Sequence, residues 1–272
     1  MAPHSILKKK FTMFFSSDTA TGARNVSADG ADFSVQLNNP LTIPANCLDC
    51  SLSVIQANIW NTSPNISADF GNNVFAFVVA ETPYSIVIPD GLYSLSGLNA
   101  YLSSQFANLG LASNVITISG DDATQKSILT FTGVGDRVDF TVANSVREVL
   151  GFDSRIAPPL PGAPSVGFNE FSDNPASFNR NNSYLITSNI VSGGIPINST
   201  SANIIASIPI DVAPGSQIVY SPRNPLAFSG NELIGAIKNS FNFQLRNQSL
   251  ETTPTAGELY SLVILFEFSV PV

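Results

Sequence analysis

Histidine and charged side chains are scarce in this chain of 272 residues. The single histidine is His4, and Asp, Glu, Lys and Arg together make up 12% of the residues, whereas a typical soluble domain carries about 25%. Ser-His-Asp and Cys-His catalytic arrangements require a histidine beside the nucleophile, so one histidine in an N-terminal arm excludes them in effect. We predict no enzyme, no catalytic residues and no cofactor. The surface must then be largely Ser, Thr, Asn and Gln, which suits faces that neighbouring subunits cover.

Cysteine is almost as scarce, and the only two cysteines form the short sequence Cys47-Leu48-Asp49-Cys50. A redox motif with this spacing begins a helix after a strand. A zinc site needs a second pair of ligands, and His4 is the only histidine that could contribute one. The pair instead follows Pro44 and leads into a strand. We therefore predict buried thiols and no metal site.

Long hydrophobic runs are also missing. No apolar segment approaches the roughly 20 residues of a membrane-spanning helix. The first ten residues are polar where a signal peptide would be hydrophobic, which predicts synthesis in a cytoplasm. Without export, the N-x-S/T sequons are expected to reflect a composition rich in Asn and Ser; they lie at Asn25, Asn61, Asn65, Asn181, Asn198 and Asn247.

Basic residues are few, and the net charge is −8. Domains that bind nucleic acid usually present a basic face, so this charge argues against a dedicated nucleic-acid-binding chain. The only basic cluster is Lys8-Lys9-Lys10, within a predicted N-terminal arm of residues 1–30. We interpret it as a solvated tail, with contact to a membrane, a genome or a neighbouring subunit as the alternative.

Short runs with a period of two dominate the rest of the chain. Phe241, Phe243 and Leu245, for example, alternate with polar residues, as in strands that are buried on one face. Other runs, such as 74–79 and 85–88, are apolar on both faces. Many short strands separated by Pro, Gly and Asn predict a mainly β sandwich or barrel. Outside the middle of the chain, seven strands are predicted at 33–37, 51–60, 184–191, 203–210, 217–220, 234–245 and 260–270.

Two segments have helical patterns instead. Leu95, Leu98 and Leu102 recur at helical spacing and predict an amphipathic helix over 95–106, with Ser94 as its N-cap. The sequence from Ser145 to Glu148 fits a capping box and predicts one or two helical turns that end at Gly151.

The order of these elements predicts an insertion. Two strands come first, a mixed α/β segment follows, and five more strands come last, so the early strands must pair with the late ones. We predict a single jelly roll formed by residues 31–71 and 167–272, an inserted lobe at 72–153 and a Pro-rich linker at 154–166. Seven strands, with one more in the loop region, approach the eight of a jelly roll. The alternative is a double jelly roll, with two rolls in tandem.

Carboxylates and aromatic residues are the remaining candidates for a site. Turn geometry explains most of the acids, and a solvent-facing strand position explains the last one. A calcium site at the acidic loops is the alternative, although no EF-hand spacing is present. The aromatic residues fit a packed core better than a sugar-binding platform. These candidates are Asp121, Asp122, Asp136, Asp139 and Glu267 among the acids, and Trp60, Tyr93 and Tyr101 among the aromatics.

Several short blocks together resemble a known family. A strand that ends in Asn58-Ile59-Trp60-Asn61 resembles the opening of the penton and minor capsid proteins of virophages and polinton-like viruses. Pro89-Asp90-Gly91-Leu92-Tyr93, a helix and then Leu150-Gly151-Phe152 are similar to a central block of that group. Later segments at 203–210, 218–222 and 240–248 resemble its closing strands.

This resemblance implies a structural capsid protein of an icosahedral virus, located in the virion and made in the host cytoplasm. It implies a jelly roll with an outward insertion, assembled as a pentamer at the vertices. Expected partners are further copies of the chain, other capsid proteins, and an internal membrane or genome through Lys8, Lys9 and Lys10, with no small-molecule substrate. The first alternative is a double jelly-roll major capsid protein that forms pseudo-hexameric trimers. Outside this class, the alternatives are a carbohydrate-binding or adhesin β-sandwich and, least favoured, a hydrolase.

Overall fold

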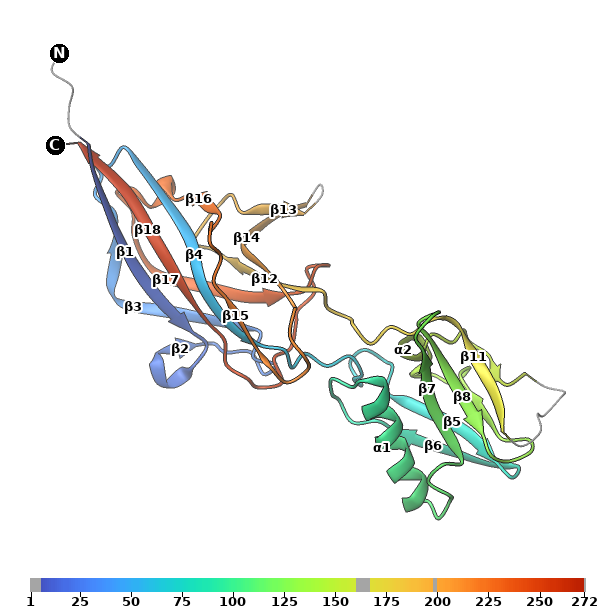
Figure 1. Cartoon of the computed structure of the whole chain (residues 1–272). Coiled ribbons are helices and arrows are strands. Elements are labelled where there is room, and N and C mark those ends of the chain that lie inside the picture. The colour runs from blue at the N-terminus through green and yellow to red at the C-terminus, as the bar shows by residue number, and fades with distance from the viewer. Residues whose placement is uncertain (1–5, 160–166, 198–199, 272) are drawn as a thin grey trace. The chain divides into compact units, whose positions relative to one another are not determined.

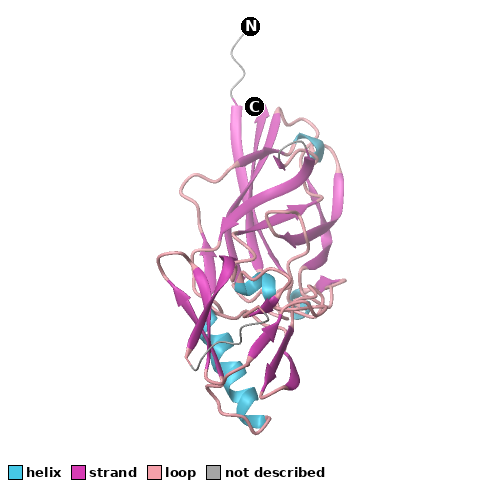
Figure 2. Cartoon of the chain, turned by 90° about the vertical axis from the view of Figure 1, so that its right-hand side faces the viewer, coloured by secondary structure: helices cyan, strands magenta, loops and turns pink. Residues whose placement is uncertain are grey.

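The computed structural model describes residues 6–159, 167–197 and 200–271. It is mainly β, as the sequence predicts, and strands dominate both views of the chain (Figure 1, Figure 2). The chain divides into two compact units. Met1–Ser63 and Asn181–Val272 together form one, here named the roll unit, and Pro64–Arg180 forms the other, here named the inserted unit.

The roll unit consists of two antiparallel sheets. The first has the order β1-β18-β4-β15, and β16 also pairs with β4. The second has the order β13-β14-β12-β17-β3-β2. The strands are β1 (Ile6–Ser16), β2 (Ala23–Arg24), β3 (Asp32–Thr42), β4 (Asp49–Trp60), β12 (Ser183–Ser188), β13 (Ile195–Ile197), β14 (Thr200–Pro209), β15 (Gln217–Tyr220), β16 (Ala227–Ser229), β17 (Ile237–Arg246) and β18 (Ser261–Pro271), with 3-10 turns at Thr19–Thr21 and Asn231–Leu233.

The order of the main strands is that of a jelly roll. When β1, β3, β4, β12, β14, β15, β17 and β18 are counted as strands one to eight, the first sheet reads 1-8-3-6 and the second reads 2-7-4-5. Neighbours in each sheet are therefore far apart in the sequence, as in two interlocked Greek keys. The inserted unit interrupts the roll between its third and fourth strands.

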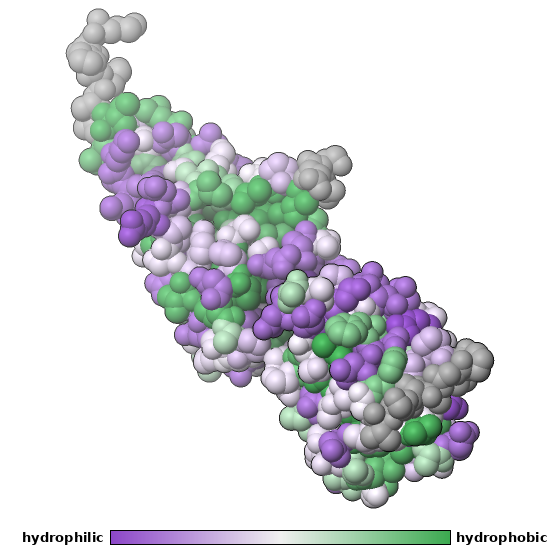
Figure 3. All heavy atoms as spheres, turned by 45° about the vertical axis from the view of Figure 1, so that its right-hand side comes forward, coloured by the Kyte–Doolittle hydropathy of each residue, from purple (hydrophilic) through white to green (hydrophobic). Residues whose placement is uncertain are grey.

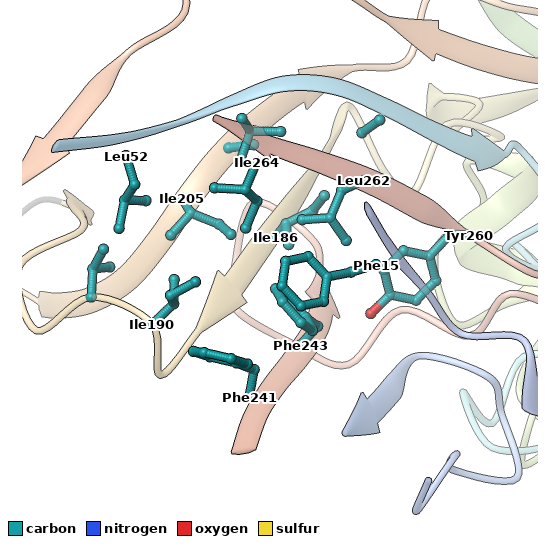
Figure 4. Packing of buried hydrophobic residues seen from close by; sticks show 14 of the residues in the cluster. Phe15, Leu52, Ile186, Ile190, Ile205, Phe241, Phe243, Tyr260, Leu262 and Ile264 are labelled. Carbon is teal, nitrogen blue, oxygen red and sulfur yellow. The ribbon is translucent and has the colours of Figure 1, made fainter. Parts of the chain in front are cut away.

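The core of the roll lies between the two sheets, where inward side chains of both meet (Figure 4). On β17 the residues Phe241, Phe243 and Leu245 are fully buried, which confirms the alternation seen in the sequence. Phe15 of the first sheet contacts Phe243 of the second with ring centroids 4.7 Å apart. Burial of such side chains is the main stabilising contribution to a sandwich.

The inserted unit has its own core. Its four-stranded sheet has the order β10-β9-β5-β6, and its three-stranded sheet has the order β11-β8-β7. On the helix α1, Leu98, Leu102 and Phe106 are buried, and the ring of Phe106 meets that of Phe77 at 5.0 Å. The elements are β5 (Val74–Val79), β6 (Thr82–Val87), α1 (Leu95–Asn108), β7 (Ile116–Asp121), β8 (Lys126–Phe131), β9 (Arg137–Asp139), α2 (Arg147–Leu150), β10 (Ile156–Ala157) and β11 (Phe168–Pro175).

The first predicted helix is confirmed, and the capping of the second is corrected. The Oγ of Ser94 accepts a hydrogen bond from the N–H of Gly97 at 3.0 Å, as an N-cap does. Ser145 does not cap α2, because the backbone there is bound to β5 by a bridge to Val74 and the N-cap position falls on Val146. Gly151 does end α2, in the left-handed conformation with φ of 80°.

The prediction that residues 1–30 form an N-terminal arm is wrong for residues 6–16, which form the strand β1. This strand pairs with β18 along its whole length, from Ile6 opposite Pro271 to Ser16 opposite Ser261. It supplies the eighth strand of the roll, which we had expected in the loop region. The sequence contains a signal for this strand, because Phe11, Met13 and Phe15 recur at every second position and are more buried than the residues between them.

The domain boundaries also differ from the prediction. We expected the insertion to end at residue 153, with a linker at 154–166 and the roll resuming at 167. Instead β10 pairs with β9, and β11 pairs with β8, so both belong to the inserted unit. Residues 160–166 of the predicted linker lie outside the described residues. The inserted unit is not a second jelly roll, because its described strands form sheets of four and three beside a helix.

Candidate interaction surfaces

One end of the roll unit exposes aliphatic side chains. Ile6, Leu7, Leu48 and Ile237, here named the apolar end, are 48–78% exposed. Leu7 lies opposite Val270, and the N–H of Leu48 donates to the carbonyl of Ser269, the residue before Val270. Ile237 lies opposite Thr42, just before the loop that leads to Leu48. The end therefore draws on both sheets. Hydrophobic atoms gather at this end of the roll in the space-filling view (Figure 3).

The basic run Lys8-Lys9-Lys10 lies on β1 rather than on a free tail. Lys8 is opposite Ser269, and Lys10 is opposite Glu267. A small pocket of about 120 Å³ on this sheet is lined by Lys8 together with Asp49 and Glu267. The strand thus places Lys8 and Lys10 near carboxylates, whereas Lys9 lies opposite Phe268, and the charge of the face that carries Lys8 is mixed rather than basic.

The outer face of the second sheet carries a polar groove. It is about 390 Å³ in volume. Seven polar residues and two apolar ones line it: Thr187, Ser188, Asn189, Asn203, Asn242, Gln244 and Arg246, with Ala202 and Leu250. A second, adjoining pocket of about 210 Å³ shares Asn242 and Gln244 with it. The sequence analysis did not single out this groove, although the polar positions of β17 between its buried aromatic residues were visible. What the sequence does not show is that β12 and β14 bring further amides beside them.

The two cysteines are free thiols in the structure. Burial, together with the nearby Cys47 and Asp49, raises the pKa of the Cys50 thiol to about 11. Cys47 is partly exposed, and its pKa is also raised, first by desolvation and then by Asp49. Since the thiolate is the reactive form, neither residue is set up as a nucleophile or a metal ligand at neutral pH.

The acidic candidates lie in separate places and serve the backbone. Asp121 accepts hydrogen bonds from the hydroxyl of Thr124 and the N–H of Ala123 in the β7–β8 turn, and the Thr124 bond lowers the pKa of this carboxyl. Buried Asp136 accepts from the N–H of Gly133 at 2.9 Å. Asp139 accepts from Thr141, whereas Asp122 lies exposed in a turn. Glu267 is on β18 of the other unit.

No set of three or more His, Cys, Asp or Glu side chains within the described residues could hold a metal ion. His4 falls outside those residues. None of the helices in the described part of the chain has the length and hydropathy needed to cross a membrane.

The aromatic candidates and the sequons have structural positions. The hydroxyl of Tyr93 donates to the carbonyl of Pro89, and its ring lies 6.2 Å from that of Tyr101. Trp60 ends β4 and is partly buried. Asn61, Asn65 and Asn247 are buried sequons, Asn181 is partly buried, Asn25 is exposed, and Asn198 lies outside the described residues.

The two sheets, their strand order and the interruption after β4 define the class: a jelly-roll protein with an inserted α/β unit. No protein-family model matches the chain, and no curated protein matches it. A solved structure titled "Crystal structure of SeMet-labeled mavirus penton protein" is similar to it, with a TM-score of 0.46 and 11% sequence identity over 96% of this chain and 100% of that one. That title names the kind of protein that the sequence motifs resemble. At this level of similarity, function has to be argued from the chain's own residues.

Proposed function

We propose that this chain is a structural capsid subunit of an icosahedral virus, and that it associates with further copies of itself through the apolar end of its jelly roll. The observation that carries the proposal is the apolar end: Ile6, Leu7, Leu48 and Ile237 are exposed together on a chain whose surface has few charges. Exposed apolar patches mark interaction sites. The core between the two sheets is formed without these four side chains, which belong to neither buried cluster.

The magnitudes favour a closed assembly over an isolated pair. Full burial of one Leu or Ile side chain is worth about 1.5–3 kcal/mol, so covering the exposed parts of these four would contribute on the order of 4–7 kcal/mol. Association costs roughly 4–15 kcal/mol. One such contact is therefore marginal, whereas a ring or shell gives each subunit contacts on two sides.

The finer proposal is a pentamer at the vertex of the shell, with other capsid proteins as neighbours and the virion as its location. A cyclic arrangement docks one surface of each copy against a different surface of the next and closes without leaving a free end. The trimeric alternative depended on two rolls in one chain, and the inserted unit is not a roll. We do not extend the proposal to a membrane or genome contact through Lys8, Lys9 and Lys10, because carboxylates line the same pocket as Lys8.

The test is the mass of the purified full chain by light scattering over a range of concentrations. We expect a species of five times the chain mass, and we expect Ile237→Ser to shift it toward monomer. Val134→Ser is the matched control, since Val134 is 66% exposed but lies in the inserted unit. A wild-type chain that stays monomeric at high concentration, or an Ile237→Ser chain that assembles normally, would contradict the proposal.

The alternative from another class, a carbohydrate-binding or adhesin β-sandwich, is favoured by one observation, the polar groove on the second sheet. If carbohydrate binding were the whole function of the chain, the chain would be a stable monomer that binds glycans. The same mass measurement therefore separates the two.

A further inference from the structure

The strand register fixes the floor of the polar groove. On β17 the side chains of Phe241 and Phe243 point into the core (Figure 4), and Leu245 is buried in the same cluster. The side chains of Asn242 and Gln244 therefore stand on the outer face. The register then brings partners beside them from both neighbouring strands. Gln244 lies opposite Thr187 of β12 and Asp32 of β3, and Asn242 lies opposite Ser34 of β3.

Hydrogen bonds within the groove hold several of these groups in place. The Oδ1 of Asn189 accepts from the backbone N–H of Asn242 at 2.9 Å, and the hydroxyl of Thr187 donates to the Oε1 of Gln244 at 3.3 Å. Since Asn189 Oδ1 and Gln244 Oε1 are engaged, their amide N–H groups are oriented for an incoming acceptor. A site held in this way loses little conformational entropy on binding.

The lining chemistry is that of a hydroxyl-rich ligand. Asn189, Asn203, Asn242 and Gln244 each carry an amide with a carbonyl acceptor and two N–H donors. A sugar hydroxyl also both donates and accepts, so neighbouring hydroxyls can pair with one amide in two bonds. An apolar segment of a protein would leave these amides without partners, which costs free energy.

The charge of the groove favours an uncharged ligand over a strongly charged one. Its one charged lining residue, Arg246, pairs with Asp32 through two hydrogen bonds of 2.9 and 3.3 Å. The guanidinium is therefore compensated on the sheet itself. One further cation, Lys238, donates to the carbonyl of the lining residue Asn189. A single such charge is far fewer than the several phosphate contacts that hold a nucleic acid strand.

The groove is also long. The adjoining pocket continues it past Ser34 of β3 to Asn25, whose side chain donates to the Ser34 hydroxyl at 3.0 Å. Together the two pockets run across β14, β12, β17 and β3 to the region beside β2. Five strands at about 4.8 Å spacing extend over about 19 Å, which suits several linked sugars better than a single one.

We propose that the polar groove on the outer face of the second sheet is a binding site for an uncharged oligosaccharide. The site does not depend on the proposed self-association, because it uses none of the residues of the apolar end. Asn242 and Gln244 contribute to both pockets and are the central contacts.

The experiment is saturation-transfer NMR on the full chain with a panel of soluble tetrasaccharides: glucose, mannose, galactose and N-acetylglucosamine oligomers, with a sulfated heparin tetrasaccharide beside them. We expect saturation transfer to at least one neutral oligomer. The doubly substituted chain Asn242→Ala, Gln244→Ala should bind it at least tenfold more weakly. Asn224→Ala is the control, an exposed amide outside the groove, and should bind as the unchanged chain does.

Three outcomes would overturn the proposal: no neutral oligomer binds, only the sulfated one binds, or the double variant binds a neutral oligomer as tightly as the unchanged chain. Asn203→Ala removes an amide from the opposite wall of the groove and provides a second, independent substitution. It should also weaken binding, and unchanged binding would count against the site. Circular dichroism verifies that each variant is folded, since Asn242 and Gln244 lie on the outer face of a sheet and Asn203 is exposed.

Discussion

At the scale of single residues, neighbours in the sequence have opposite roles because side chains alternate along a strand. Phe15 is 2% exposed and packs between the sheets, whereas Phe14, one position earlier, is 63% exposed on the outer face of the first sheet. Both are phenylalanines in the same strand, with the same neighbour, β18. Any difference between their substitutions therefore reports the packing and not the residue type.

We predict that Phe15→Ala destabilises the roll by about 3–5 kcal/mol, because a buried aromatic side chain is replaced by a cavity. Phe14→Ala should change the free energy of unfolding by less than about 0.5 kcal/mol. Urea unfolding of both variants, followed by circular dichroism, measures the difference. Equal losses would mean that β1 is not part of the packed roll.

A second residue-scale feature is the ion-pair cluster around Arg155 in the inserted unit. The guanidinium of Arg155 contacts Asp173 at 2.9 Å and Glu170 at 2.8 Å, and it lies over the ring of Phe152. Partial burial alone would raise the pKa of Asp173, but the hydrogen bond and charge of Arg155, with the N–H of Asp153, outweigh it and lower the pKa.

The sign of the pH dependence follows from this lowered pKa. The Asp173 carboxylate contributes stability that is complete above its unfolded pKa of about 3.9, and this contribution is lost as the pH falls through the lower folded pKa. Asp173→Asn should therefore cost about 1–2 kcal/mol at pH 7, and the deficit should shrink below about pH 4. Calorimetric unfolding at pH 7 and pH 3 measures it. Asp122→Asn, on an exposed turn, is the control and should cost little at pH 7. A deficit that stays constant with pH for Asp173→Asn would refute the assignment.

At the scale of elements, a local sequence pattern predicts a helix correctly when all the interactions that define the helix lie within its own segment. The helix α1 was predicted because its apolar spacing and its capping serine are both within the segment, and both appear in the structure. The short helix α2 shows the opposite case. A bridge between Ser145 and Val74, 71 positions earlier in the sequence, shifts the cap by one residue.

The cap of α1 gives a prediction at this scale. Ser94→Ala should destabilise the first turn by about 1 kcal/mol, because the N–H of Gly97 loses its acceptor. Ser94→Asp should restore most of the loss, since an aspartate also accepts at this position. Amide hydrogen exchange across α1 is the measurement. Equal protection in all three chains would show that the cap contributes nothing.

At the scale of the whole molecule, the roll is closed without the inserted unit. Ser63 and Asn181, where the chain leaves and re-enters the roll, are joined by a hydrogen bond of 3.0 Å between their side chains. On the other side of the boundary, the Nδ2 of Asn65 donates to the carbonyl of Phe178 at 2.8 Å. In each unit, residues at or near the two boundaries are thus held together by a hydrogen bond of that unit.

We predict that replacing residues 64–180 with a short Gly-Ser linker leaves a folded roll. Its ends are already close, and each unit has a separate core. The expected result is a β-type circular dichroism spectrum and one cooperative unfolding transition. Deleting residues 6–16 instead should abolish that transition, because it removes the edge strand β1, with its buried Phe15, and leaves one side of β18 unpaired. Loss of folding in the first variant would contradict the division into units.

The sequence by itself determined the features that depend on the periodicity of apolar residues and on composition. The alternation of apolar residues determined the mainly β class and the seven strands that became β3, β4, β12, β14, β15, β17 and β18. The helix α1 followed from its own spacing. With a single histidine in the sequence, Ser-His-Asp and Cys-His arrangements were not expected.

The tertiary structure alone decided which strands pair and which faces they present. Most strands of the roll pair with partners far away in the sequence, so nothing local shows that β1 belongs beside β18. The same holds in the inserted unit, where β11 pairs with β8. For the same physical reason, the apolar end and the polar groove could not be predicted. Each collects side chains from strands and loops that only long-range pairing brings together.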